Sequence, residues 1–272
     1  NMSEYVRPFL KWPGGKYRVL KHILPHFPSR KILMEPFVGS GAVFLNTDFD
    51  NYILGDINPD LINLYKAVQK EGHEFIKYVR KYFTARYNNA DKYYSLREKF
   101  NLINDPYEKS ALFLYLNRHG YNGLCRYNKK AGFYNVPFGT YKRPYFPEYE
   151  LEFFHQKSQK AKFYCYSFKK LLKKAKSNTL VYADPPYIPL SASASFTQYH
   201  KGGFNSSDQE ELAQIAQELA QNNVSIILSN HSTEYTKKMY AQSIIHEFYA
   251  PRLISCKTRK KVKELIAVFG IP

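Results

Sequence analysis

The residues best suited to chemistry are four consecutive ones, Asp184, Pro185, Pro186 and Tyr187, which directly follow a short apolar run. Two successive prolines fix φ and remove two N–H donors, which leaves the Pro185 carbonyl oxygen free to accept a hydrogen bond. An amino group on a heterocyclic base is a weak nucleophile, because its lone pair is delocalised into the ring. A carboxylate and a carbonyl that accept its two N–H bonds favour the nucleophilic form, and the Tyr187 ring offers a stacking surface. The same residues are also compatible with a plain Asp-Pro turn beside a packed tyrosine.

A second chemically informative pattern is the turn Gly39-Ser40-Gly41 together with Asp56, 17 residues beyond Gly39. Glycines let a backbone approach a ligand at a strand end, and an acidic residue after the next strand binds ribose hydroxyls. The pattern therefore indicates a nucleoside site, with a structural turn as the alternative. Phe44 stands where the NAD fingerprint requires its third glycine, which disfavours NAD.

The composition points to a polyanionic partner. The 272 residues include 40 Lys and Arg against 23 Asp and Glu, a net charge of +17, and 25 of the residues are Tyr. Excess positive charge attracts the nucleic acid backbone, and interleaved aromatic rings provide stacking surfaces for bases. With 44% hydrophobic residues and no bilayer-length apolar run, we expect a folded, soluble, intracellular-type protein.

Cysteine usage excludes several kinds of chemistry. Cys125, Cys165 and Cys256 are odd in number and scattered, so neither a disulfide framework nor a cysteine-only zinc site is expected. None follows a proline in a candidate catalytic loop, as thiolate attack on cytosine C5 would need. Cys125 is expected in a hairpin and Cys165 in the core. The eight histidines show no metal-ligand spacing, so we predict no metal.

The elements that must position these residues alternate between strands and helices. Strands are expected at 31–35, 52–56, 161–165, 179–183, 224–228, 244–248 and 265–269. Helices are expected from Pro59 to Gln69 and from Ser207 to Gln221, the latter with acidic residues in its first turn. This alternation predicts a doubly wound, mostly parallel, Rossmann-like α/β sheet.

Residues 58–146 interrupt the alternation. Helical patterns at 74–82, 90–100 and 107–117 precede a segment rich in Gly, Asn and basic residues. That segment, about 119–141, predicts a β-hairpin with its turn at 129–132. We therefore expect a main domain of residues 1–57 and 147–272, and an inserted domain of residues 58–146.

Six segments, in one order along nearly the whole chain, resemble the motifs of the Dam family of GATC-specific DNA adenine-N6 methyltransferases. They are Phe9–Lys16, Glu35–Gly41, Gly55–Asn58, Leu116–Asn128, Asp184–Tyr187 and Thr258–Val262. The resemblance implies a catalytic main domain, which binds S-adenosyl-L-methionine, and an inserted target-recognition domain. It implies methyl transfer to adenine N6 in double-stranded DNA by base flipping and direct in-line transfer, without a metal.

The resemblance also assigns roles to individual residues. Cofactor contacts fall on Trp12, Lys16, Phe37, Gly39, Asp56, Ser167, Phe168 and Asp184. Catalysis falls on Asp184, Pro185, Pro186 and Tyr187. DNA contacts fall on Lys11 and Arg126 as guanine readers, Leu124 and Pro137 at the thymine side, and Tyr121 and Asn122 as the wedge that replaces a flipped adenine. The chain departs from the family at Thr140, where relatives carry a basic residue, and in a hairpin that is one residue longer.

Other functions remain compatible with the sequence. The catalytic tetrapeptide also suits another short DNA site, cytosine N4 or RNA, and a basic DNA-binding relative without activity is the alternative outside enzymology. A solitary regulator of replication or mismatch repair and a restriction-modification partner are both compatible with these motifs. The resemblance further implies a cytoplasmic protein of a prokaryotic nucleoid or a phage-infected cell, monomeric in solution and without a membrane partner.

Overall fold

The computed structural model describes residues 4–188, 204–251 and 261–271, which fold into two compact units. The sheet unit combines residues 18–38, 47–57 and those described from 166 onward. The helical unit combines the described residues up to 17, 39–46 and 58–165. The inserted segment 58–146 thus lies wholly within the helical unit, and its role as a recognition domain stays a prediction.

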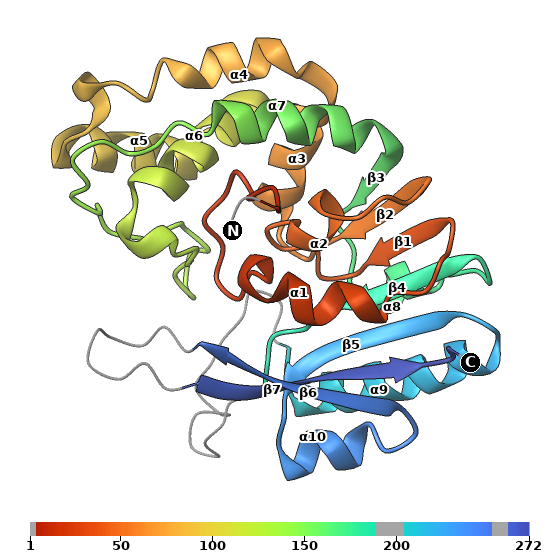
Figure 1. Cartoon of the computed structure of the whole chain (residues 1–272). Coiled ribbons are helices and arrows are strands. Elements are labelled where there is room, and N and C mark those ends of the chain that lie inside the picture. Colours follow the sequence, from red (N-terminus) through yellow and green to blue (C-terminus); the bar gives the residue numbers. More distant parts are fainter. Residues whose placement is uncertain (1–3, 189–203, 252–260, 272) are drawn as a thin grey trace. The chain divides into compact units, whose positions relative to one another are not determined.

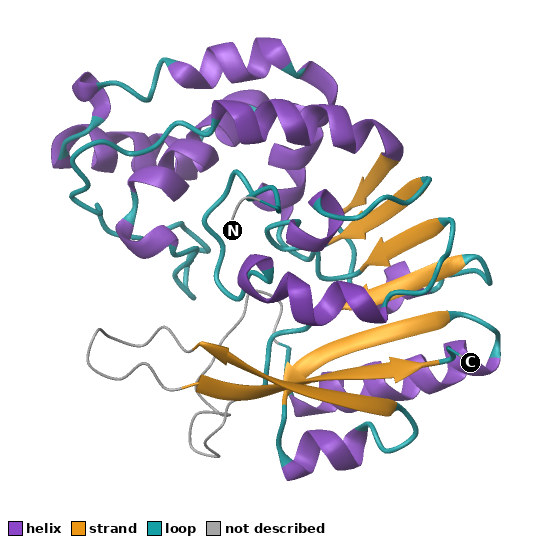
Figure 2. Ribbon diagram, viewed as in Figure 1, coloured by secondary structure: helices purple, strands orange, loops and turns teal. Residues whose placement is uncertain are grey.

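The sheet unit confirms the expected α/β class. Its described strands follow the order β2-β1-β4-β5-β7-β6, drawn as orange arrows in Figure 2. Their bounds are β1 Ile32–Glu35, β2 Asn51–Gly55, β4 Thr179–Ala183, β5 Ser225–His231, β6 Ile244–Pro251 and β7 Lys261–Phe269. The four strands β2, β1, β4 and β5 run parallel, and β7 pairs antiparallel with both β5 and β6. Because β1 pairs with β2 on one side and β4 on the other, the chain reverses direction across the sheet at β1, where ligands bind in such folds.

Four helices accompany this sheet: α1 Leu20–Ile23, α8 Phe168–Leu172, α9 Ser206–Gln221 and α10 Glu234–Met239. The longest of them, α9, begins at Ser206, one residue before the start expected from the sequence, and ends at Gln221 as expected. It begins with a capping box in which Asn205 and Asp208 bond each other's backbone N–H groups. Figure 1 shows α9 alongside β5 and β7, against which it packs, and Leu212, Ala213 and Ala216 are among its buried residues.

The helical unit is built around a buried helix. Its elements are α2 Ala42–Leu45, α3 Pro59–Glu71, α4 His73–Arg80, α5 Ala90–Leu102, α6 Pro106–His119, α7 Glu148–Lys157 and the strand β3 Ala161–Tyr164. Helix α6 packs against α3, α4 and α5 and is buried along most of its length. Helix α3 begins at Pro59 as expected, because the Asn58 side chain accepts from the N–H groups of Asp60 and Leu61.

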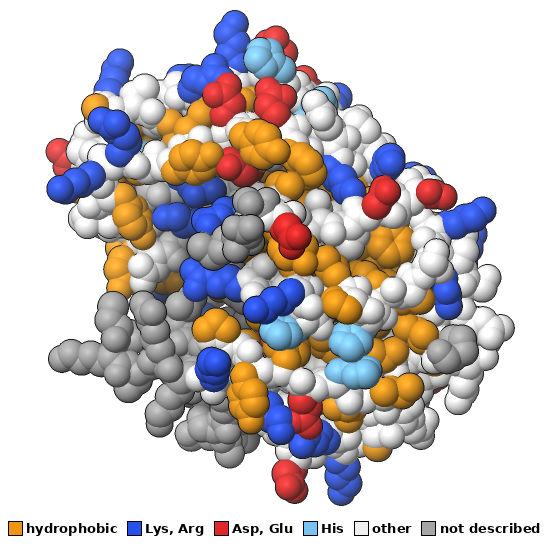
Figure 3. All heavy atoms as spheres, in the orientation of Figure 1, with side chains coloured by type: hydrophobic (Ala, Val, Ile, Leu, Met, Phe, Trp, Pro, Cys, Tyr) orange, Lys and Arg blue, Asp and Glu red, His pale blue; other side chains and the backbone are white. Residues whose placement is uncertain are grey.

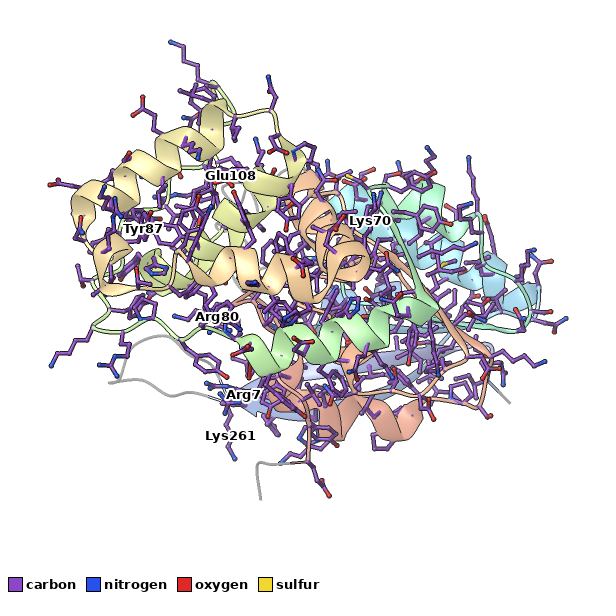
Figure 4. All side chains as sticks on the ribbon, turned by 90° about the horizontal axis from the view of Figure 1, so that it is seen from above. Arg7, Lys70, Arg80, Tyr87, Glu108 and Lys261 are labelled. Atoms are coloured by element: carbon purple, nitrogen blue, oxygen red, sulfur yellow. The ribbon has the colours of Figure 1, made fainter. Side chains whose placement is uncertain are left out.

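A buried carboxylate ties three of these helices together. Glu108 of α6, labelled in Figure 4, accepts hydrogen bonds from the Tyr78 and Tyr82 hydroxyls. The Lys99 ammonium lies 3.3 Å from the Glu108 carboxylate. Burial raises the pKa of Glu108. Polar partners on every side explain how a carboxylate persists in this core.

The expected hairpin forms with little regular structure. Two isolated bridges, Gly120 with Phe138 and Tyr127 with Tyr134, take the place of continuous strands. The backbone of Asn128 donates to the Phe133 carbonyl at 2.8 Å, which closes the turn predicted at 129–132.

One expectation about burial is wrong. Cys165 is exposed, not in the core, whereas Cys125 is half-buried in the hairpin as expected. Strand β3 ends at Tyr164, so Cys165 no longer shares the inward face of Ala161 and Phe163.

None of the helices that the structure describes combines the length and apolarity required to cross a bilayer.

Candidate functional site

Three predicted ligand-binding residues lie at one edge of the sheet unit. Phe37 follows β1, Asp56 follows β2 and Asp184 follows β4, and these strands are parallel neighbours. The Val38 N–H donates to the Gly55 carbonyl at 2.8 Å, which fixes the turn after β1 against the end of β2. The structure therefore brings these residues to the carboxyl edge, at the point where strand order reverses.

An aromatic cluster stands at this edge. The rings of Phe37 and Phe168 stack with centroids 5.7 Å apart, and Phe204 meets both edge-on at 5.4 Å. Phe168 is buried, whereas Phe37 and Phe204 are half-buried and retain exposed ring surface. Such a cluster suits a flat aromatic ligand such as a purine ring. Ser167, predicted beside Phe168, uses its hydroxyl to cap α8 by accepting from the Lys170 N–H.

The tetrapeptide after β4 is held from two sides by buried side-chain amides. Gln209 donates from Nε2 to the Pro186 carbonyl at 2.6 Å, and Asn230 accepts at Oδ1 from the Ile188 N–H at 3.2 Å. Asn230 also donates to Gln209 Oε1 at 3.2 Å, so the two amides form one network. No described residue donates to the Pro185 carbonyl, the predicted acceptor, whereas the Pro186 carbonyl is engaged.

Tyr187, the last residue of the tetrapeptide, packs its ring against a residue of β5. Its ring meets the His231 ring edge-on, with centroids 4.8 Å apart. Burial, followed by the nearby Asp184 charge, raises the pKa of Tyr187, so the phenol stays neutral at physiological pH. The proposed stacking role of its ring stays a prediction.

The glycine turn and the N-terminal motif meet within the helical unit. Gly39 has φ +50°, which favours glycine, and a Cβ added there would lie tightly against the Trp12 ring, 3.2 Å from Cδ1. The Tyr65 hydroxyl donates to the Gly39 carbonyl. Lys16 is buried and donates from Nζ to the Gly14 carbonyl at 2.9 Å. The assignment of Trp12, Lys16 and Gly39 to the cofactor stays a prediction.

The predicted guanine reader Lys11 has a fixed backbone and a sheltered ammonium. The Asn117 side chain accepts from the Lys11 N–H at 2.9 Å and donates to the Lys11 carbonyl at 2.6 Å. The ammonium lies over the Tyr141 ring, 4.2 Å from its centroid. Burial and the nearby Arg118 lower the pKa of Lys11. Gly123 lies against the Lys11 side chain, too close for any Cβ.

The predicted wedge residues project from the start of the hairpin. Tyr121 is exposed, and its N–H donates to the Pro137 carbonyl at 2.8 Å. Asn122 is exposed with φ +53°, a left-handed conformation that asparagine tolerates better than most residues. Its N–H donates to the Tyr141 hydroxyl at 2.9 Å, so Tyr141 contacts both this turn and Lys11.

The remaining predicted DNA contacts lie along the hairpin. Arg126 is exposed, and Leu124 and Pro137 are half-buried. The Tyr134 hydroxyl donates to the Leu124 carbonyl at 3.1 Å. On the face shown in Figure 3, Lys and Arg side chains outnumber Asp and Glu, in keeping with the net charge of +17.

Several residues that organise the site gave no signal in the sequence: Phe204, Gln209, Asn230, Tyr141 and Asn135. They act through contacts with distant segments, and no local motif marks them. In the C-terminal motif, residues 258–260 lie outside the described residues, and Lys261 and Val262 begin β7. Within the described chain, no group of three or more His, Cys, Asp or Glu side chains is placed to hold a metal ion.

The strand order and the carboxyl edge of the sheet define a doubly wound, Rossmann-like α/β protein. Residues 12–252 match the D12 class N6 adenine-specific DNA methyltransferase family, and the chain belongs to that family.

Curated relatives are similar over nearly the full length. A DNA adenine methylase of Salmonella typhi is 51% identical over 97% of this chain and 95% of its own length. DNA adenine methylases of Serratia marcescens and of Escherichia coli K12 are each 50% identical over 97% of this chain, and over 98% and 95% of their own lengths. Among solved structures, the methyltransferase domain of delta-N METTL16 has a TM-score of 0.38 at 6% identity, over 92% of this chain and 78% of its own.

Proposed function

We propose that this chain transfers a methyl group from S-adenosyl-L-methionine to N6 of adenine in double-stranded DNA, at GATC. The observation that carries the proposal is the braced Asp184–Tyr187 loop at the carboxyl edge of the sheet, beside an aromatic cluster and Asp56. Membership in an adenine-specific DNA methyltransferase family supports the same reaction.

The residues at this edge fit the proposed cofactor. Phe37, Phe168 and Phe204 present aromatic surface for its adenine ring, and Asp56 follows β2, the position from which an acidic residue binds ribose hydroxyls in such folds. The glycine at position 39 lets the backbone lie close to the Trp12 ring, and a ligand-binding turn uses glycine for the same kind of close approach. When bound, the cofactor supplies an electrophilic methyl group on a sulfonium.

The protein's part in the chemistry is to activate and orient the amine. The Asp184 carboxylate and the Pro185 carbonyl accept hydrogen bonds from the two N–H groups of the N6 amino group, which concentrates its lone pair toward the incoming methyl. As the N–CH3 bond forms and the S–CH3 bond breaks, leaving S-adenosyl-L-homocysteine, the amino group gives up one N–H proton, for which the Asp184 carboxylate is the hydrogen-bonded acceptor. Gln209 and Asn230 hold the loop, so that these acceptors need no rearrangement when charge develops. The Tyr187 ring stacks on the target base.

Recognition is assigned to the helical unit. Lys11 and Arg126 bind guanine acceptors in the major groove, and Leu124 and Pro137 contact the thymine methyl. Tyr121 and Asn122 fill the stack from which adenine is flipped, a step that costs a few kcal/mol and needs a filler. The exposure of Tyr121, Asn122 and Arg126 supports this assignment.

Methyl incorporation from labelled S-adenosyl-L-methionine tests the proposal. The substrates are a duplex with one GATC, every single-base-pair variant of that site, an adenine-free duplex of G·C pairs, and a matched RNA duplex. We expect label in the GATC duplex, recovered as N6-methyladenine by mass spectrometry, and a salt-dependent binding constant. N4-methylcytosine, equal rates on all variants, or binding without incorporation would each contradict a named part of the proposal.

A further inference from the structure

Arg126 has a specific partner across the hairpin. Its Nε–H donates to the Asn135 side-chain oxygen Oδ1 at 2.9 Å, and the Asn135 N–H donates to the Arg126 carbonyl at 3.0 Å. Asn135 thus binds both the backbone carbonyl and the guanidinium of Arg126. Among the described residues, no other hydrogen-bond partner of the Arg126 guanidinium is present.

Asn135 is itself fixed to helix α5 through its two neighbours. The Asn101 side chain of α5 accepts from the Tyr134 N–H at 2.8 Å and donates to the Tyr134 carbonyl at 3.0 Å. The Val136 carbonyl accepts from the Tyr93 hydroxyl at 2.8 Å and from Arg97 at 3.0 Å. Both residues that flank Asn135 are therefore anchored, and Tyr134 and Val136 are buried.

A guanidinium has five N–H donors, one on Nε and two on each terminal nitrogen. It can bind a guanine side-on through Nε and one terminal nitrogen, or end-on through both terminal nitrogens. Because Asn135 occupies Nε–H, only the end-on fork remains available to O6 and N7 of guanine.

We propose that Asn135 is a positioning residue for base recognition, which holds the Arg126 guanidinium so that its terminal nitrogens face the base. The inference rests on the proposed function, in which Arg126 reads a guanine of the target site. Arg126 is exposed, and an exposed arginine loses rotamer freedom when it is ordered. Part of that ordering is complete before DNA binds, which sharpens the difference between the correct base pair and the others.

The neutral amide is suited to this task. Its oxygen accepts from Nε–H without cancelling the positive charge that draws Arg126 toward guanine. Asn135→Asp keeps an acceptor of the same shape, and Asn135→Ala removes it. Lys130, exposed at the hairpin turn, offers a control that removes a charge without touching Arg126.

The test combines two measurements on the wild type, Asn135→Ala, Asn135→Asp and Lys130→Ala. The first is the nuclear magnetic resonance signal of Arg126 Nε–H in the free protein, assigned by its loss in Arg126→Lys. The second is the ratio of methylation rates on GATC and on duplexes changed at the guanine that Arg126→Ala identifies. Thermal unfolding establishes that each variant is folded.

We expect Asn135→Ala to increase Nε–H mobility and solvent exchange, and to narrow discrimination at that base pair by about 3- to 10-fold. Discrimination at the other positions should remain, and Asn135→Asp should retain the ordered signal. Combined with Arg126→Ala, Asn135→Ala should add nothing at that base pair. Lys130→Ala should lower the rates on all duplexes by the same factor.

Two results would overturn the inference. An unchanged Nε–H signal in Asn135→Ala would show that Asn135 does not hold the guanidinium. Equal loss on every duplex, as for Lys130→Ala, would show that Asn135 contacts phosphate. A wild type without preference for GATC would instead contradict the proposed function, and this result appears before any variant is compared.

Discussion

The loop at residues 184–188 and the hairpin at residues 119–141 are both fixed by side-chain amides, but in opposite environments. Gln209 and Asn230, which hold the loop, are 3% and 0% exposed. Asn101 and Asn135, which hold the hairpin, are half-buried, and Arg126 beyond them is exposed. A buried amide that loses its partner pays the full cost of desolvation, whereas an exposed one recovers water. The difference predicts a rigid loop at the proposed chemical centre, and weaker, more adaptable contacts in the hairpin proposed for recognition.

The most severe test of the comparison removes the proposed reacting carboxylate. Asp184→Ala should lower kcat by at least about 100- to 1000-fold, because the variant loses the carboxylate that stabilises the positive charge developing on N6 in the transition state. DNA binding should remain within a few-fold of the wild type, because the hairpin is untouched. Single-turnover methylation and fluorescence anisotropy measure the two effects. Near-wild-type turnover would remove Asp184 from the mechanism, and equal losses in both assays would mean that the two regions are not separable.

Acidification should act on the base of the hairpin. His119 is buried against Tyr115, its carbonyl accepts from the Gly139 N–H, and burial lowers its pKa to about 4. An unfolded histidine titrates near 6.5, so the unfolded chain binds the extra proton between these values. The contribution of His119 to the free energy of unfolding is therefore complete above pH 6.5. It should be lost progressively as the pH falls toward 4, by up to about 3 kcal/mol.

Urea unfolding of the wild type and His119→Gln between pH 7 and 4 measures this contribution. It appears as the difference between the two proteins in how steeply the free energy of unfolding changes with pH. Glu108 works in the opposite direction. Its pKa is raised by burial, so the folded state gains stability from this group as pH falls. Parallel pH profiles for the wild type and His119→Gln would show that His119 is not buried neutral.

Much of the sheet unit could be predicted from the sequence. Its parallel strands are short apolar runs, and Asp56 and Asp184 were placed at strand ends from position alone. Helix α7 was missed because its pattern buries only Leu151 and Phe154, and α1, α8 and α10 are too short to show periodicity. The hairpin was expected as paired strands, but it forms two isolated bridges, because side-chain bonds to α5 replace the ladder.

The partners of the site residues could not be predicted. Gln209 reaches Pro186 across 23 residues of sequence, and Asn230 reaches Ile188 across 42. A polar side chain inside a helical or strand pattern carries no local sign of the distant group that it will satisfy. Tertiary packing alone decides which of these amides becomes a brace.

Arg126→Ala tests the hairpin side of the comparison directly. Loss of a bidentate contact to guanine should cost about 1–3 kcal/mol of discrimination at one base pair. Arg126→Lys should recover affinity better than discrimination, since lysine keeps the charge but lacks the planar fork. Methylation rates on GATC and its single-substitution variants measure both. Uniform loss over all duplexes, with a salt slope lowered by about one unit, would assign Arg126 to phosphate instead.

Gln209→Ala provides the matching test of the loop. The variant leaves the Pro186 carbonyl and the Asn230 amide without their partner in a buried setting, which should lower stability by about 1–3 kcal/mol. A loosened loop should also lower kcat by about 10-fold with little change in KM, because the acceptors are no longer preorganised. Sequence discrimination should be unchanged. If Gln209→Ala changed sequence discrimination without lowering kcat, the loop at residues 184–188 would act in recognition and not in the chemical step.

The smallest effect is expected where the hairpin is tied to α3. The Tyr127 hydroxyl donates to Asp60 Oδ2 at 2.6 Å, and burial, with Cys125 and Asp60 nearby, raises the pKa of Tyr127 so that it stays a donor. Tyr127→Phe keeps the ring against Tyr134 and removes the hydroxyl, which donates to Asp60 and accepts from the Asn58 side chain at 3.2 Å, and this loss should lower stability by about 1 kcal/mol.

On saturating GATC duplex, Tyr127→Phe should leave kcat within about twofold of the wild type and narrow discrimination slightly at the bases read by the hairpin. Tyr134→Phe is the matched control, since it removes a single hydroxyl bond to the Leu124 carbonyl from the same hairpin. Urea unfolding and the rate ratios on variant duplexes measure the two effects together. A tenfold loss of kcat in Tyr127→Phe, with sequence discrimination intact, would mean that the hairpin affects the chemical step through α3. The loop at residues 184–188 and the hairpin would then not act independently of each other.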